Sequence, residues 1–216
     1  AREGGSEVLK FETSRKFRDV SAWYHIVMAF DSTNALGSDR FKVYFNGQRD
    51  TTALGTTPSL NTELVVLENV IHNIGRDNHS GTTYYYDGYM TEIQLIDGYA
   101  YGPEYFGKFS SDLIWVPIEY SGSYGSNGFY LKGSNSGSLG ADSSGNGNNF
   151  TSSGLAANDQ KTDTPTNNMI TFNPLNNQRS GGTVSNGNLD YEGPGTRTLI
   201  SLTANIPSTG KWAIAF

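Results

Sequence analysis

Apolar and polar residues alternate with a period of two along short segments of this chain. In residues 40–45 every second position is phenylalanine or valine, a pattern that turns one face of a strand toward a core. Residues 22–30 are rich in bulky and β-branched side chains and predict a well-buried strand. Asn46 and Gly47 follow the first segment, and this dipeptide favours the tight turn of a hairpin.

Further short apolar segments follow at similar spacing. Residues 64–67 and 70–75 predict two short strands, or one strand broken by a bulge. The tyrosine-rich residues 84–89 lead into residues 90–98, where apolar and polar positions again alternate. No window shows the 3.6-residue apolar period of an amphipathic helix. Short strands separated by Gly and Asn turns predict an all-β fold of the β-sandwich type.

The composition changes after about residue 120. Residues 121–154 are dominated by Gly, Ser and Asn around a short apolar island at residues 129–131, so we expect an extended connector or loops clamped onto a neighbouring surface. We therefore predict a sandwich over residues 1–110, a linker region with short strands over 111–182, and the start of a second β-domain over 183–216. Because the chain starts without Met and stops inside an apolar run, we expect a piece of a longer polypeptide whose first sandwich lacks N-terminal strands.

Composition and charge exclude several classes of function. The 216 residues include 26 glycines and no cysteine, and only 17% are charged, which excludes a disulfide framework and thiol catalysis. The net charge of −6 argues against nucleic-acid binding, which needs a basic footprint. No apolar run approaches the roughly 20 residues of a membrane helix, so we expect no membrane insertion.

Tyrosine side chains are the most numerous candidates for binding a ligand. They cluster between residues 84 and 105, and on alternating strand positions half of them must point away from a core. Exposed tyrosines offer a flat apolar face and a hydroxyl to sugar rings, but tyrosines are equally favoured where subunits pack. The candidate ligand-binding residues are Tyr84, Tyr86, Tyr89, Tyr99 and Tyr101.

One segment has the spacing of a calcium loop. Asp142, Ser144, Asn146 and Asn148 place oxygen-bearing side chains at alternate positions, with a glycine at the sixth. The twelfth position is Ser153 instead of the bidentate Glu that completes such a shell. We therefore expect weak calcium binding at best. A Gly/Asn turn before a strand explains the segment equally well. We expect no other cofactor.

The sequence contains little that indicates a catalytic site. Glycosidases on sandwich folds use two carboxylates on one face of a strand. The nearest pair is Glu92 and Asp97, and its odd spacing puts the two side chains on opposite faces. His72 and His79 bracket a Gly/Asn turn and could meet a metal, but the sequence offers no third ligand for them. His25 lies in an apolar segment as a packed residue. We expect no enzyme.

The first half of the chain resembles laminin-G/concanavalin A-like jelly-roll domains. Such domains carry a Trp-x-His-hydrophobic strand, a turn and a strand ending in Tyr-x-Asn-Gly. The residues that carry the resemblance lie at 23–27, 30–31, 43–47, 74–75 and 87–93. The resemblance covers about residues 8–107 and implies a lectin-like sandwich.

A second resemblance concerns the middle of the chain. Residues 106–107, 115–117, 120–131, 142–151 and 163–168 are similar to a block of large virion proteins of tailed phages from marine and cyanobacterial hosts. In those proteins the block links a lectin-like sandwich to a SPRY-like β-domain, which residues 185–189 and 208–212 resemble at its opening. The resemblance transfers no catalytic residue.

Together these observations predict a non-enzymatic structural or adhesive component of a virion, such as a tail fibre or a tail-associated or capsid-surface protein. Its expected location is the particle surface, and its expected partners are other virion proteins, further copies of itself and host surface glycans. Two alternatives remain open at this stage: a glycan depolymerase on the same fold, and a secreted cellular adhesin.

Overall fold

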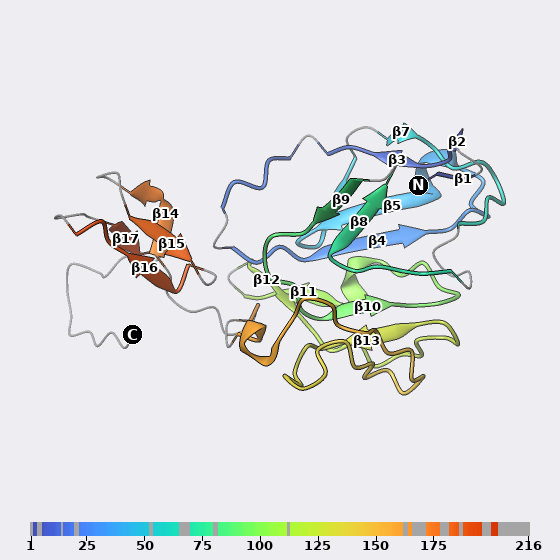
Figure 1. Cartoon of the computed structure of the whole chain (residues 1–216). Helices are drawn as coiled ribbons and strands as arrows, with labels where there is room; N and C mark the ends of the chain where they lie inside the picture. Colours follow the sequence, from blue (N-terminus) through green and yellow to red (C-terminus); the bar gives the residue numbers. More distant parts are fainter. Residues whose placement is uncertain are drawn as a thin grey trace. The chain divides into compact units, whose positions relative to one another are not determined.

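The computed structural model is all-β, as the sequence predicts (Figure 1). It describes residues 2–3, 6–13, 15–19, 22–51, 54–64, 70–79, 82–111, 113–161, 164–165, 172–177, 182–185, 188–195 and 200–202. The chain divides into two compact units, residues 1–16 with 24–166, and residues 17–23 with 167–216. The division into sandwich, linker and second domain stays a prediction.

Unit 1 is built from short strands and single-turn 3-10 helices. Its strands are β1 (Arg2–Glu3), β2 (Ser6–Glu7), β3 (Lys10–Phe11), β4 (Ile26–Phe30), β5 (Phe41–Phe45), β6 (Gln48–Asp50), β7 (Leu54–Thr56), β8 (Arg76–His79), β9 (Thr82–Tyr85), β10 (Ile93–Leu95), β11 (Gly107–Phe109), β12 (Trp115–Pro117) and β13 (Phe129–Leu131). Its helices are η1 (Gly37–Asp39), η3 (Pro103–Tyr105) and η4 (Ala157–Asp159).

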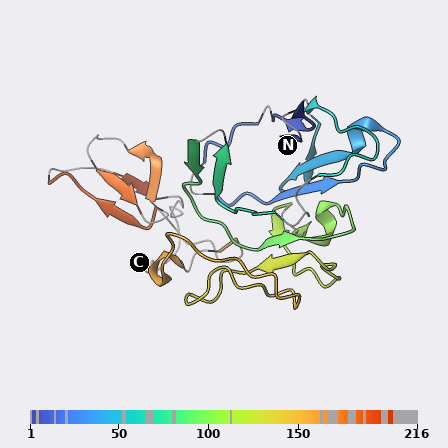
Figure 2. The ribbon, with the colours of Figure 1, turned by 45° about the vertical axis from the view of Figure 1, so that its right-hand side comes forward.

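All strand pairs in the described chain are antiparallel. In unit 1 the pairs are β1–β2, β3–β7, β8–β9, β10–β13 and β11–β12, beside the three-stranded sheet β4–β5–β6. Figure 2 shows the β10–β13 pair below the β4–β5–β6 sheet, as Figure 1 does.

The described part of unit 2 contains β14 (Phe172–Asn177), β15 (Thr183–Ser185), β16 (Asp190–Glu192) and β17 (Ile200–Leu202). They form the antiparallel pairs β14–β17 and β15–β16. The predicted SPRY-like opening at residues 208–212 lies outside the described residues.

The predicted hairpin between β5 and β6 is confirmed. Asn46 and Gly47 have φ angles of 48° and 76°, the left-handed pair that a two-residue hairpin turn requires. The ladder continues beyond β4, because Asn46 N–H donates to the carbonyl of His25 and His25 N–H donates to Asn46 Oδ1, both at 2.8 Å. The turn therefore fixes the register of the β4–β5–β6 sheet, called the central sheet below.

An extended N-terminal segment covers one face of the sheet at β5 and β6. Phe11 packs edge-on against Phe41 with ring centroids 6.1 Å apart, and Arg15 lies over the ring of Phe45 at 5.6 Å. Between them Thr13 donates a 2.5 Å hydrogen bond to the buried carboxylate of Asp50. Residues 11, 13 and 15, at alternate positions of the chain, therefore all contact the same face of the sheet.

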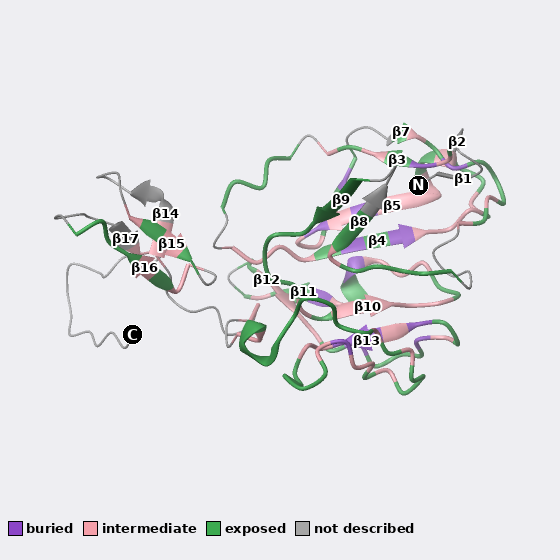
Figure 3. Ribbon diagram, in the orientation of Figure 1, coloured by how far each residue is buried: buried purple, intermediate pink, exposed green. Residues whose placement is uncertain are grey.

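This cover stops before β4, which corrects one expectation. Residues 22–30 were expected to form a well-buried strand, but Met28 is 69% exposed although Val43, directly opposite it, is buried. Val27 and Ala29, on the other face of β4, are buried. Figure 3 shows this mixture of buried and exposed positions along the strand.

A second correction concerns residues 70–75. They form no strand, and Ile71 is almost fully exposed. Gly75 adopts a φ of 74°, and the strand of this region, β8, begins only after it. Of the preceding predicted strand at residues 64–67, only Leu64 is described, and it is not in a strand.

Trp115 on β12 joins the β11–β12 hairpin to the central sheet. Its indole N–H donates to His25 Nδ1 at 3.0 Å, across 90 residues of sequence. A Cβ added to Gly47 or Gly107 would lie 2.3 Å from the indole ring, so both positions admit only glycine in this packing. Since indole nitrogen only donates, His25 Nδ1 must be unprotonated in the fold.

Acid should weaken this contact. Burial lowers the pKa of His25 below its ordinary value of 6.5, so the unfolded chain binds a proton before the folded protein does. The free energy of unfolding should be highest above about pH 7 and should fall as pH decreases toward about 5. Urea unfolding of the wild type and of His25→Gln over that range measures the effect. Equal pH slopes for the two proteins would contradict it.

Candidate functional site

Three tyrosines around η3 form an exposed stack, here called the tyrosine stack (Tyr99, Tyr101 and Tyr105). The rings of Tyr99 and Tyr101 are parallel within 6°, with centroids 5.2 Å apart. The rings of Tyr101 and Tyr105 are 4.2 Å apart and also stacked. Tyr99 is 60% exposed and Tyr105 45%, whereas Tyr101 between them is half-buried. The stack therefore presents aromatic surface to solvent from a fixed position.

The tyrosine stack stands on a buried aromatic cluster. Tyr101 contacts Tyr120 at 6.0 Å, and Tyr120 contacts Tyr124 edge-on at 5.2 Å. Tyr124 stacks on Tyr130 at 5.8 Å. Tyr120, Tyr124 and Tyr130 are buried. Aromatic contacts of this kind contribute roughly 0.5–1.5 kcal/mol each beyond the burial of their area, so the row fixes the exposed rings to the core.

Strand pairing and hydrogen bonds hold the cluster in register. Gln94 on β10 pairs directly with Tyr130 on β13. The hydroxyl of Tyr124 donates to Gln94 Oε1 at 3.1 Å, and that of Tyr130 donates to the carboxylate of Glu92. Gln94 on β10 and Glu92, which directly precedes the strand, thus each bind one of the two hydroxyls.

The ionisation of these two tyrosines is suppressed. Burial raises the pKa of Tyr124 to about 12, with smaller contributions from Tyr120 and nearby carboxylates. Burial and the hydrogen bond to Glu92 also raise the pKa of Tyr130. Both hydroxyls therefore stay protonated near neutral pH and remain hydrogen-bond donors.

The loop between Tyr120 and Tyr130 is held closely against β10. A Cβ on Gly128 would lie 1.8 Å from the carbonyl oxygen of Tyr124, so only glycine fits there. Asp97 accepts two hydrogen bonds from Asn127, from its backbone N–H at 3.1 Å and from its side chain at 3.0 Å. The glycines of this loop permit the backbone to pack closely, and the rings of Tyr124 and Tyr130 lie in the buried cluster as a result.

The structure divides the five predicted tyrosines into two groups. Tyr99 and Tyr101 stack together, whereas Tyr84, Tyr86 and Tyr89 lie on β9 and the loop after it. Neither Tyr84 nor Tyr86 contacts a ring of the tyrosine stack among the described residues. A ligand-binding role for any of these tyrosines stays a prediction.

Sequence reasoning missed the remaining members of the aromatic row. Tyr105 belonged to the recognised tyrosine cluster but not to the predicted site. Tyr120, Tyr124 and Tyr130 lie in residues 120–131, part of the block that resembles phage virion proteins, and no binding role was predicted for them. The available signal was that three tyrosines interrupt a segment otherwise poor in apolar side chains.

The predicted calcium segment folds around Asp142. Asp142 Oδ1 accepts hydrogen bonds from the backbone N–H groups of Tyr130 and Ser144, both at 2.8 Å. Its Oδ2 accepts from Ser144 Oγ at 2.8 Å and from the N–H of Asn148 at 2.9 Å. One carboxylate thus folds its own loop and fastens it to β13.

The two asparagines of that segment fasten it to the preceding loop. Asn146 Nδ2 donates to the carbonyls of Gly125 and Gly128 at 2.6 and 2.9 Å. Asn148 Nδ2 donates to Gly128 at 2.9 Å and to Ser126 at 3.2 Å. These bonds account for the alternate polar residues of the segment, and calcium binding by it stays a prediction. The described residues contain no group of three or more His, Asp or Glu placed to hold a metal ion.

Residues 1–101 match a laminin-G-type family model described as the concanavalin A-like lectin/glucanases superfamily. The all-β fold confirms the predicted fold class, and the match is consistent with a concanavalin A-like β-sandwich over residues 1–101. No curated protein and no solved structure matches the chain. Among the described residues, no helix has the length and apolar character needed to cross a membrane. The resemblances to phage virion proteins and to a SPRY-like domain stay predictions.

Replacement of Asp142 should destabilise the folded protein. Burial alone would raise the pKa of Asp142. The hydrogen bonds from the N–H groups of Tyr130, Ser144 and Asn148 and from the Ser144 hydroxyl lower it by more, so the net shift is downward. The charged form therefore stabilises the fold at neutral pH, and this contribution is lost as pH falls through the pKa of the folded state. Asp142→Asn turns an amide donor toward at least one N–H group and should cost about 2 kcal/mol.

Chemical denaturation at neutral pH measures this cost, with Asp87→Asn at an exposed position as the control. An Asp142→Asn protein as stable as the control would show that the carboxylate does not fasten the loop.

Proposed function

We propose that this protein is a non-enzymatic, lectin-like adhesive module that binds glycans through the tyrosine stack. The observation that carries the proposal is the exposure of Tyr99 and Tyr105 at the end of an otherwise buried aromatic row. Sugar rings bind to flat aromatic faces through their apolar C–H surfaces, and neighbouring hydroxyls add hydrogen bonds. A stack whose base is buried binds without first ordering its side chains, which reduces the entropic cost of binding.

The carboxylate pair considered for hydrolysis, Glu92 and Asp97, favours binding over hydrolysis. A retaining or inverting glycosidase needs two carboxyl groups facing one bond. Glu92 instead accepts a hydrogen bond from the Tyr130 hydroxyl, and Asp97 accepts two hydrogen bonds from Asn127. Both groups are used to hold the aromatic cluster and its loop, which disfavours the alternative of a glycan depolymerase.

The proposed setting is the surface of a virion, as a tail fibre or a tail-associated or capsid-surface component. This part of the proposal rests on the similarity of residues 106–168 to the linking block of phage virion proteins, with a SPRY-like domain beginning near residue 183. Repeated copies on a particle would convert weak binding at each stack into strong attachment. The same fold in a secreted cellular adhesin is the alternative setting.

Glycan binding should depend on Tyr99 and not on Tyr84. A glycan array identifies a ligand, and calorimetric titration with its monovalent fragment then measures affinity. Tyr99→Ala should weaken binding about tenfold, the worth of one aromatic stacking contact. Tyr99→Phe should retain most of the affinity because the ring remains.

Tyr84→Ala is the matched control, since Tyr84 is 63% exposed and lies outside the stack. Equal loss of affinity in Tyr84→Ala and Tyr99→Ala, or no glycan signal from the folded wild type, would refute the assignment.

A further inference from the structure

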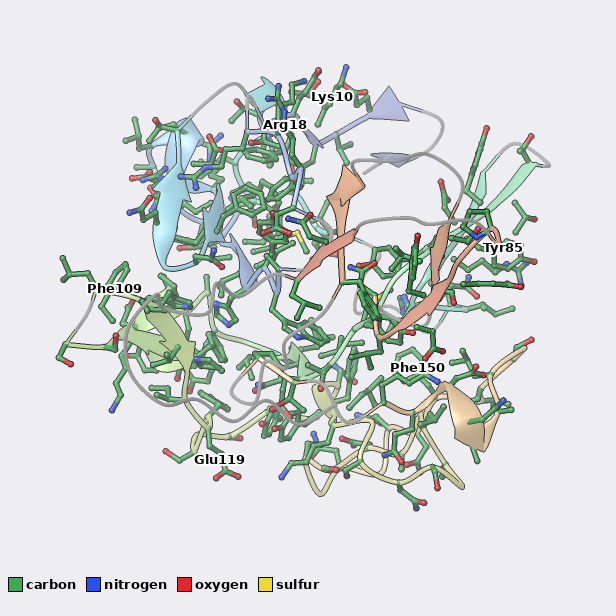
Figure 4. All side chains as sticks on the ribbon, turned by 90° about the vertical axis from the view of Figure 1, so that its left-hand side faces the viewer. Lys10, Arg18, Tyr85, Phe109, Glu119 and Phe150 are labelled. Atoms are coloured by element: carbon green, nitrogen blue, oxygen red, sulfur yellow. The ribbon has the colours of Figure 1, made fainter. Side chains whose placement is uncertain are left out.

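The β8–β9 hairpin exposes tyrosines on both of its faces. In the described chain its two strands pair only with each other. Arg76 lies opposite Tyr85, and Asp77 opposite Tyr84. Tyr84 is 63% and Tyr85 75% exposed. Figure 3 draws β9 as exposed, and Figure 4 shows Tyr85 at the rim of the drawn side chains.

Such a hairpin has unused binding surface. A two-stranded ribbon is marginally stable on its own in water, and exposed apolar side chains that lie together mark a surface that meets another molecule. Tyrosine is enriched where proteins pack together. Because adjacent strand residues point to opposite sides, Tyr84 and Tyr85 cannot be covered by one layer of this chain.

The two faces carry opposite charges. Residues directly opposite each other in an antiparallel pair share a face, so one face presents Arg76 with Tyr85 and the other presents Asp77 with Tyr84. Neither Arg76 nor Asp77 forms an ion pair with another described residue. We call these the basic face (Arg76, Tyr85) and the acidic face (Asp77, Tyr84).

We propose that a second copy of this chain occupies the hairpin, with the basic face of one copy against the acidic face of the next. This arrangement sets Arg76 beside the partner's Asp77 and Tyr85 against the partner's Tyr84. A symmetric contact of like faces would instead bring two arginines or two aspartates into one interface without an opposite charge from this pair. The contact is therefore head-to-tail, and it generates a ring or a filament according to its angle.

Charge reversal tests the arrangement. Sedimentation velocity over a range of concentrations should show self-association of the wild type that weakens as salt is raised. Arg76→Glu makes both faces acidic and Asp77→Arg makes both basic, so each variant alone should sediment as a monomer. The double variant Arg76→Glu/Asp77→Arg should associate again, and so should an equimolar mixture of the two single variants.

Circular dichroism verifies that each variant is folded, and Asp87→Arg, with the same charge change at an exposed position after β9, should associate as the wild type does. A wild type that is monomeric at every concentration would overturn the proposal. So would loss of association in only one single variant, which indicates a different partner on one face, or a folded double variant that stays monomeric.

Discussion

The stacking of tyrosine rings from three separate segments organises the second half of unit 1. Tyr101, Tyr120 and Tyr124 contact one another in sequence, and Tyr130 ends the row beneath β10. Without these contacts a segment rich in Gly, Ser and Asn would have little apolar surface to bury. With them, the same glycines become useful, because they let the backbone approach β10 closely enough for the rings to meet. The Asp142 loop then fastens the outer side of β13.

The other half of unit 1 depends on coverage from both sides of one small sheet. Residues 11, 13 and 15 cover one face over β5 and β6, and Trp115 reaches His25 beside the other. Both covers come from segments distant in sequence. The first contacts the sheet through alternate residues, and the second lies where Gly47 and Gly107 leave room for the Trp115 indole ring. Where a cover stops, as at Met28, apolar side chains remain in solvent.

Local patterns predicted the features that local forces determine. The alternation in β5 and the Asn46–Gly47 turn were correctly inferred because strand faces and hairpin turns are set by neighbouring residues. The exposure of Met28 and the absence of a strand at Ile71 were not, because both depend on which distant segment covers the position. The same limit applies to the site. Tyrosine content indicated a binding surface, but only the contact of Tyr101 with the buried Tyr120 shows that the tyrosine stack has a buried base.

We propose adhesion through the tyrosine stack and contacts between copies through the β8–β9 hairpin. Saturation-transfer NMR with a bound glycan tests the central assignment most directly, because saturation passes from the protein most strongly to the sugar protons that lie closest to it. We predict strong transfer to the C–H groups on one side of a pyranose ring, and its loss in Tyr99→Ala. Transfer of equal strength to all sugar protons, or transfer unchanged in Tyr99→Ala, would contradict it.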